Sequence, residues 1–325
     1  MTVQTGLAPR RLSDRPESEL LAPGTGMGAV TIRVADLDAQ TAFYRDGVRL
    51  TVLEQHAGGP AGPARVVLGR LATPVVVLEH APQLSHAGPR EAGLYHVAVV
   101  FQRRGDLAAS LYSTATHYPG SFVGSSDHFV SEAFYFTDPE GNGVELYWDR
   151  ARTDWGWVDG RIRMGGSRLD PNDFLRRHLT EVDAAPAGAA AGTSPLTSPA
   201  KVGHVHLSVG DLDVARAFYV DRLGFEVVAE MAGQGLFVSA GGYHHHMAMN
   251  TWNSRGAGRR HRTLGLGMVR VGVPGTDDLA ALDERLHHHG IHPGHDGASL
   301  RLADPWGNAI EVTVAPDAAP DGTPV

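Results

Sequence analysis

The chain has 325 residues, a formal net charge of -8 and no cysteine. This length suits two domains better than one core, and the acidic balance argues against a nucleic-acid-binding surface. Without cysteine there is no disulfide and no thiolate ligand, so a metal would have to be held by His, Asp or Glu. No apolar run reaches the ~20 residues of a membrane helix, and residues 1–21 lack the apolar segment of a secretory signal, so we expect a cytoplasmic protein with no membrane or nucleic-acid partner.

The N-terminal half is expected to hold a mobile tail (1–24) and two βαβββ units within residues 25–150. In unit one (27–81), a strand ending at Val34 precedes a helix that Asp36 caps and whose buried stripe includes Tyr44. Unit two (93–150) is expected to contain a helix at 105–118.

A connector at 151–201 follows, with a short helix predicted near 171–182 and an Ala/Gly/Pro/Ser-rich stretch too poor in large apolar groups to pack. Units three and four are expected within 202–315, at 202–253 and 264–315, with a helix at 277–289 and a mobile tail at 316–325.

These units are recognised by internal repeats. The run from Val34 to Asp46 returns from Val209 to Asp221, at an offset of 175 residues. A second pair of runs, Asp-Pro-x-Gly-Asn, ends at Asn142 and again at Asn308, and each is a turn with Gly and Asn at positions that tolerate positive φ. Repeats of this length indicate repeated supersecondary units. The expected fold class is therefore α+β, with four βαβββ units pairing into two half-barrel cavities, one of which binds a metal.

Three ionisable residues stand inside runs where a strand would ordinarily have an apolar side chain. They are His96 in Gly-Leu-Tyr-His-Val-Ala-Val, Glu145 in Gly-Val-Glu-Leu-Tyr-Trp, and His204 in Gly-His-Val-His-Leu. Two imidazoles and one carboxylate are the set that holds non-haem Fe(II) and leaves positions open for substrate and dioxygen. A single such histidine would more often be a hydrogen-bonded core residue, whereas three at matching repeat positions indicate a metal site.

The repeats resemble the vicinal-oxygen-chelate superfamily, which includes glyoxalases, bleomycin-resistance proteins and extradiol dioxygenases. The most specific runs are Ser131–Trp148 and Gly241–Trp252, and they are most similar to the two-domain catechol 2,3-dioxygenase-like branch. The resemblance covers most of residues 27–315. It implies an oxidoreductase that opens the ring of a catechol-type substrate with O2 at an Fe(II) site, with Mn(II) as an alternative metal. Members of the superfamily are often oligomers, so a homo-oligomer is expected.

The distribution of the candidate ligands indicates how the units pair, and this pairing departs from the common arrangement of the family, in which unit one pairs with two and unit three with four. The ligands that the resemblance implies are a first-strand His from each of two paired units and a last-strand Glu from one of them. Unit one has Ala29 where unit three has His204, and unit four has Met268 where a first-strand His is required. Only units two and three together supply His96, Glu145 and His204, so we expect the site to form across the connector. Units one and four would then form a metal-free cavity. The alternative is a site within units three and four, formed by His204, Glu311 and one of the three histidines at 244–246.

Other site residues are expected from the same resemblance. Tyr135 matches a tyrosine that hydrogen-bonds the substrate, and His128 matches a substrate-binding histidine upstream of it. His245 matches the acid/base histidine, although His244 and His246 beside it leave the register uncertain by one residue. The remaining pocket candidates are His246, Asn250 and Trp252.

Two other functions fit the same fold. A glyoxalase-type metal-dependent lyase or isomerase would ordinarily use a second carboxylate, and a metal-free antibiotic-binding protein would not need the three ligands together. The combination of His96, Glu145 and His204 with an additional histidine and tyrosine favours the dioxygenase, whose partners would be a small aromatic diol and O2.

Overall fold

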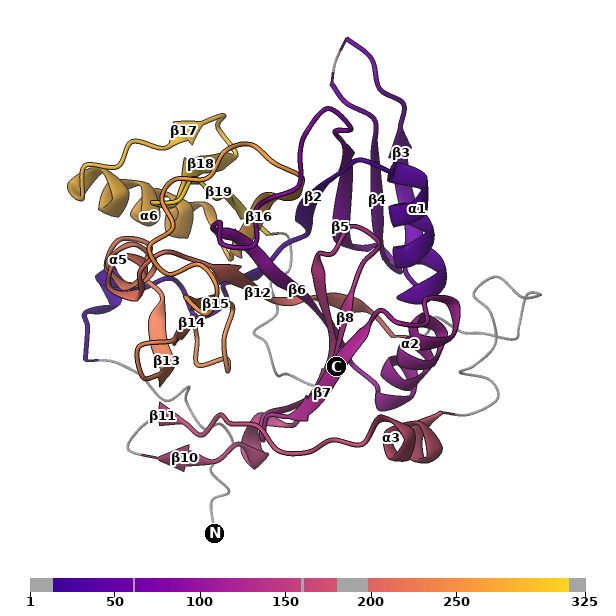
Figure 1. The fold of residues 1–325 in the computed structure, drawn as a ribbon. Helices are drawn as coiled ribbons and strands as arrows, with labels where there is room; N and C mark the ends of the chain where they lie inside the picture. The colour runs from indigo at the N-terminus through magenta and orange to yellow at the C-terminus, as the bar shows by residue number, and fades with distance from the viewer. Residues whose placement is uncertain (1–13, 61, 159–160, 180–197, 316–325) are drawn as a thin grey trace.

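The computed structural model describes residues 14–60, 62–158, 161–179 and 198–315. Within these residues, two large curled sheets lie against each other, helices flank them, and a short hairpin lies at one edge (Figure 1).

Four units are present, each with a first strand, a helix and three further strands. Unit one comprises β2 (Val30–Val34), α1 (Leu37–Ala42) with a π-helical extension η2 (Phe43–Gly47), β3 (Thr51–His56), β4 (Arg65–Arg70) and β5 (Thr73–His80). Unit two comprises β6 (Gly93–Phe101), α2 (Arg104–His117), β7 (Phe122–Asp127), β8 (Ser131–Thr137) and β9 (Gly143–Asp149).

The second half repeats this order. Unit three comprises β12 (Ala200–Ser208), α5 (Leu212–Arg216) with its π-helical extension η4 (Ala217–Arg222), β13 (Glu226–Met231), β14 (Gly235–Ser239) and β15 (Met247–Asn250). Unit four comprises β16 (Gly265–Val273), α6 (Thr276–His288), β17 (Gly294–His295), β18 (Ser299–Ala303) and β19 (Ala309–Val314). The predicted α+β class with four repeated units is confirmed.

The units pair as the distribution of candidate ligands predicted. One sheet has the order β13-β14-β15-β12-β6-β9-β8-β7, so β6 of unit two lies beside β12 of unit three. The other has the order β17-β18-β19-β16-β2-β5-β4-β3, with β1 (Gly26–Met27) beside β16, and it joins units one and four. Each sheet therefore contains one unit from each half of the chain.

The repeated sequence motifs also link neighbouring units. Asp36 and Asp211 accept backbone N–H groups at the starts of α1 and α5, as expected of N-caps.

The Tyr219 hydroxyl donates to Asp304 at 2.9 Å, in the Asp-Pro-x-Gly-Asn turn of unit four. Tyr44 makes the equivalent, longer contact with the turn of unit two. These buried tyrosines thus connect units one with two and three with four, across the division between the sheets.

The described segments outside the units pack against the units. Residues 14–24, which fall within the predicted N-terminal tail, contain η1 (Glu17–Glu19) and the buried Leu21. Arg15 donates to the Val220 carbonyl at 2.8 Å. The connector forms η3 (Arg152–Asp154), β10 (Trp157–Val158), β11 (Arg161–Ile162) and α3 (Pro171–His178). The tails 1–13 and 316–325 and the connector stretch 180–197 lie outside the described residues.

The sheet of units one and four has an ion-pair cluster where the other sheet has its candidate ligands. Glu311 is paired with Arg270 at 2.6 Å and with Arg301 at 2.8 Å. Arg270 lies opposite Glu311 in the ladder, as Ala98 lies opposite Glu145 in the other sheet. Two guanidinium groups therefore occupy the carboxylate that would otherwise be free to bind a cation.

None of the helices in the described parts of the chain is both long and apolar enough to cross a bilayer.

Candidate metal centre and active site

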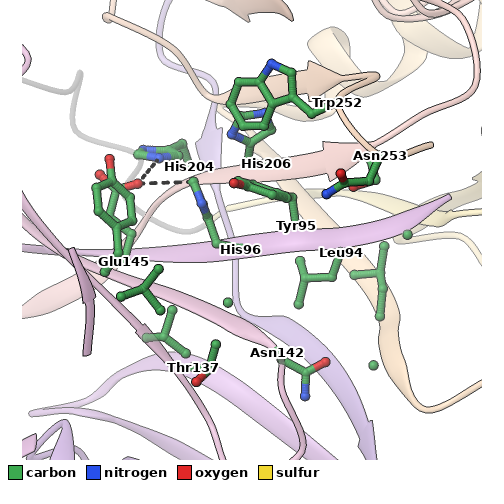
Figure 2. Close-up of a pocket in the computed structure, with 18 of the residues that line it drawn as sticks. Leu94, Tyr95, His96, Thr137, Asn142, Glu145, His204, His206, Trp252 and Asn253 are labelled. Carbon is green, nitrogen blue, oxygen red and sulfur yellow. Dashed lines mark hydrogen bonds and ion pairs between the residues drawn. The ribbon is translucent and has the colours of Figure 1, made fainter. Parts of the chain in front are cut away.

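The three predicted ligands converge from three adjacent strands of the sheet formed by units two and three. Glu145 on β9 places Oε2 3.1 Å from Nε2 of His96 on β6 and 3.1 Å from Nε2 of His204 on β12 (Figure 2). The candidate ligand atoms all lie within 4.8 Å of one another, and all three side chains are buried. No other such group of three His, Asp or Glu residues occurs in the described residues.

A β-bulge on β12 puts the histidines on one face of the sheet. In the β12–β6 ladder, Val202 opposes Val99 whereas His204 opposes Ala98, so Gly203 is an extra residue on β12. Residues directly opposite each other in an antiparallel ladder share a face, and a one-residue slip moves a side chain to the other face. Without the bulge, His204 would oppose a residue that faces the core and would point away from His96.

The second bulge restores the register and recruits another side chain. His206 opposes His96, but Leu207 opposes Leu94, so Tyr95 is the extra residue on β6. Bulges often redirect a side chain beside an active site. As a result both Tyr95 and its sequence neighbour His96 reach the same cavity, where the Tyr95 ring lies 4.9 Å from that of His206.

Gly203 is required by close packing as well as by register. A β-carbon there would overlap the Tyr147 hydroxyl, which is buried and held 2.8 Å from the Tyr243 hydroxyl. We expect Gly203→Ala to lower stability by about 1–3 kcal/mol and to weaken metal binding by displacing His204, as measured by thermal unfolding and by metal analysis. Adding Tyr147→Phe, which removes the overlapping oxygen, should restore part of both. A Gly203→Ala protein with wild-type melting temperature and metal content would contradict this role.

The pKa shifts of Glu145 and His204 favour the forms that bind a metal. Burial alone would raise the pKa of Glu145, but the neighbouring His204, and then His96, hold it well below its usual range. Burial lowers the pKa of His204 to about 4, although Glu145 raises it in part. A carboxylate and a neutral imidazole are the forms that bind a metal. Moreover, Nε2 of His96 is buried without a hydrogen-bond partner in the described residues, so a cation between the three side chains would satisfy it.

A chain of hydrogen bonds orients His245. The His245 ring lies 4.0 Å from that of His204, and its Nδ1 is 2.8 Å from Nδ1 of His244. Nε2 of His244 is in turn 2.8 Å from Oδ1 of Asp149. Because a carboxylate only accepts, Nε2 of His244 donates to it, and its Nδ1 is then an acceptor in the neutral ring. In this arrangement, with a neutral His244 ring, His245 donates from Nδ1 and keeps an unprotonated Nε2.

The His245 ring is kept neutral by its surroundings. Burial lowers the pKa of His245 well below its ordinary value, and the neighbouring imidazoles add to this effect. It lines the cavity, so a basic nitrogen is available beside the three candidate ligands.

Tyr135 and His128 form a second hydrogen-bonded pair at the cavity. Tyr135 opposes Glu145 in the β8–β9 ladder, and its hydroxyl lies 2.6 Å from Nε2 of His128. Nδ1 of His128 donates to the carbonyl of Gly165 in the connector, at 2.6 Å. Burial, and then the Glu145 charge, raise the pKa of Tyr135 well above its ordinary value, so the phenol remains protonated.

A cavity of about 1260 Å³ surrounds these groups. It is lined by His96, Glu145, His204, His245, Tyr135 and His128, which were predicted, and by Tyr95 and His206, which were not. Trp252 also lines it, with its ring 5.1 Å from that of Tyr95 (Figure 2).

Two residues expected in the substrate pocket do not line this cavity. His246 accepts the backbone N–H of Ala240 at 3.1 Å, and its ring lies 5.0 Å from that of Tyr243. Asn250 is buried behind His206 and lies 3.0 Å from its Nε2. Asn250 thus contacts His206, which lines the cavity, but does not line the cavity itself.

Besides Tyr95, His206 is a cavity residue that the sequence analysis did not predict. It lies two residues after His204, on the same face of β12, and its ring is 4.8 Å from that of His96. The alternation of a strand was a sufficient signal, since i and i+2 share a face. Burial, followed by the charges of His96 and His204, lowers its pKa well below the ordinary value.

Comparison with known proteins agrees with this fold. The family model described as Glyoxalase/Bleomycin resistance protein/Dioxygenase superfamily matches residues 26–146 and 201–312, and the chain belongs to this superfamily. Within it, the chain is 34% identical over 292 residues to a catechol-2,3-dioxygenase of Bacillus subtilis (strain 168), covering 88% of this chain and 95% of that protein.

Solved structures show the same fold at low identity. Glyoxalase I from Zea mays superposes with a TM-score of 0.53 at 15% identity, covering 89% of this chain and 92% of that one. The cppA protein from Streptococcus pneumoniae TIGR4 gives a TM-score of 0.51 at 12% identity, with coverages of 88% and 98%. At such identities the likeness concerns the fold alone.

Proposed function

We propose that the protein is an extradiol dioxygenase, which opens the ring of a catechol-type substrate with O2 at Fe(II), or at Mn(II) in its place. The observation that carries this proposal is the convergence of His96, Glu145 and His204 at the wall of one large cavity. The related catechol-2,3-dioxygenase supports the same reading.

The three ligand side chains would hold the metal from one side and leave the cavity side open. When bound, Fe(II) or Mn(II) would lower the pKa of a catechol hydroxyl and allow electrons to pass from the ring to O2. One carboxylate and two neutral imidazoles leave such a divalent cation with a net positive charge, which suits an anionic catecholate.

His245 is proposed as the acid/base group. Its unprotonated Nε2 can take a proton from a substrate hydroxyl and return it later in the reaction, provided that the ring stays in position. Asp149 and His244 hold it in the required tautomer through two contacts of 2.8 Å. This role follows from the direction of the hydrogen bonds.

Tyr135 and His128 are proposed to position the substrate. The protonated phenol of Tyr135 has one hydrogen to donate, to His128 or to a substrate oxygen beside Glu145. Gly165 fixes the tautomer of His128 so that its Nε2 can accept that hydrogen. The pair can therefore exchange its internal hydrogen bond for one to the substrate as the substrate enters.

The test is anaerobic reconstitution of the purified protein with Fe(II) or Mn(II), followed by metal analysis and by oxygen uptake with catechol. We expect one metal ion per chain and oxygen uptake that depends on both metal and catechol. A metal-loaded protein that consumes no oxygen with any of a panel of catechols would overturn the proposal. Turnover of a thiol adduct of a 2-oxoaldehyde under the same conditions would favour a glyoxalase-type reaction instead.

A further inference from the structure

A cationic side chain lines the metal-site cavity at a distance from the metal centre. Arg260 is half-buried in the segment between β15 and β16 and borders the same cavity as His96. A β-carbon at Gly93 would lie 3.5 Å from Cζ of Arg260. Gly93 precedes His96 by three residues on β6. At about 3.3 Å per residue of strand, Arg260 therefore lies roughly 10 Å along β6 from the candidate ligand His96.

The guanidinium of Arg260 is anchored by neutral groups. Its backbone N–H donates to the Trp306 carbonyl at 2.8 Å, and its two terminal nitrogens donate to Asn308 at 3.1 Å and Thr263 at 3.0 Å. These side-chain contacts use two of the five N–H groups of an arginine. Within the described residues the rest of the fork has no partner, so it can donate to a group in the cavity.

Arg260 differs in this respect from its neighbours. Arg262 and Arg33 both pair with Glu79, at 3.5 Å and 3.4 Å. Among the described residues, no Asp or Glu forms an ion pair with Arg260, although Glu91 and Asp304 are near enough to raise its pKa, against the larger opposing effect of burial. Both carboxylates are already hydrogen-bonded, Glu91 to the Gly88 N–H and Asp304 to Asn308. A partly buried cation without a carboxylate partner is costly unless a ligand supplies one.

The part of the cavity between the candidate metal ligands and Arg260 suits a substituted ring. The cavity, of about 1260 Å³, is larger than the ~300–1,000 Å³ typical of small-molecule pockets. Tyr95 and Trp252 lie along its wall (Figure 2), at the β6 end that leads from His96 toward Gly93. Aromatic walls of this kind bind flat apolar groups by offset or edge-to-face contact.

We propose that Arg260 binds an anionic substituent of the substrate, so that the preferred substrate is a catechol carrying a carboxylate side chain directed away from its two hydroxyl groups. This inference rests on the proposed ring-cleaving function. The planar fork of arginine matches a carboxylate bidentately, which a lysine cannot reproduce.

The test compares two probes, 3,4-dihydroxyphenylacetate and the neutral 4-ethylcatechol, by calorimetric titration without oxygen, both without added metal and with Mn(II). We expect the wild-type protein to bind the acid roughly 10–100-fold more tightly than the neutral diol, which is the contribution of a charge-assisted hydrogen-bonding pair. Arg260→Ala should remove this preference and Arg260→Lys should retain part of it. Arg262→Ala, which removes an exposed arginine paired with Glu79, should leave it unchanged.

Equal affinity of the wild-type protein for the two probes, or a preference that survives Arg260→Ala, would overturn the inference. Oxygen uptake separates this result from the proposed function. Uptake with both diols and no preference for the acid would refute the anion site alone. The predicted affinities without oxygen uptake for any metal and diol would refute ring cleavage and leave the anion site standing.

Discussion

Glu145→Ala is expected to abolish stoichiometric metal binding. The carboxylate is the one anionic group among the three candidate ligands, and its Oε2 lies 3.1 Å from both imidazoles. Loss of a group that only supports a ligand typically weakens metal affinity by ~10–100-fold, so loss of a ligand should cost more than about 100-fold. Metal analysis after dialysis, together with oxygen uptake, measures the effect, and His96→Ala and His204→Ala should behave in the same way.

Glu311→Ala is the matched control, because Glu311 occupies the equivalent last-strand position in unit four. Its carboxylate is paired with Arg270 and Arg301. Its removal should therefore lower the melting temperature, because Arg270 loses its carboxylate partner and Arg301 keeps only Asp296, while one metal ion per chain remains bound. Wild-type metal content in the Glu145→Ala protein, or loss of metal in Glu311→Ala, would place the metal elsewhere.

His245→Ala is expected to keep its metal and lose turnover by roughly 10²–10⁴-fold, the usual effect of removing a positioned general acid/base. The reason is structural, since His245 borders the cavity but is not one of the three converging ligands. Steady-state oxygen uptake at saturating catechol gives the loss in kcat, and metal analysis of the same sample shows whether the site is intact.

His246→Ala separates this role from that of the neighbouring histidine. The His246 ring accepts the Ala240 N–H and does not line the cavity, so its removal should cost about 1–3 kcal/mol of stability without a loss of kcat comparable to that of His245→Ala. An active His245→Ala protein beside an inactive but folded His246→Ala protein would assign the acid/base role to His246.

The pairing of units and the convergence of three ligands could be predicted because both depend on residues that can be recognised from the local sequence. A histidine or glutamate inside an apolar strand is conspicuous, and the 175-residue offset shows that Ala29 stands where His204 would be needed. The count of available ligands then favours the pairing of unit two with unit three. The structure confirms that β6 lies beside β12.

The bulges and the role of the connector could not be predicted in the same way. Register is a property of two strands, and the extra residues Gly203 and Tyr95 become visible only when β12 is aligned with β6. Likewise, Gly165 lies in a stretch without periodicity, so its hydrogen bond to His128 has no local signature. His246 was placed in the pocket by motif, but it lies in the turn before β15, where strand alternation does not apply.

The most direct test of ring cleavage is the structure of the product formed from catechol by the iron-loaded protein under O2, determined by ¹³C nuclear magnetic resonance on uniformly labelled substrate. Cleavage beside the two hydroxyl-bearing carbons predicts an open chain with one aldehyde carbon and one carboxylate carbon. A product with two carboxylates, or unchanged catechol in the presence of protein with one iron per chain, would contradict the proposed function.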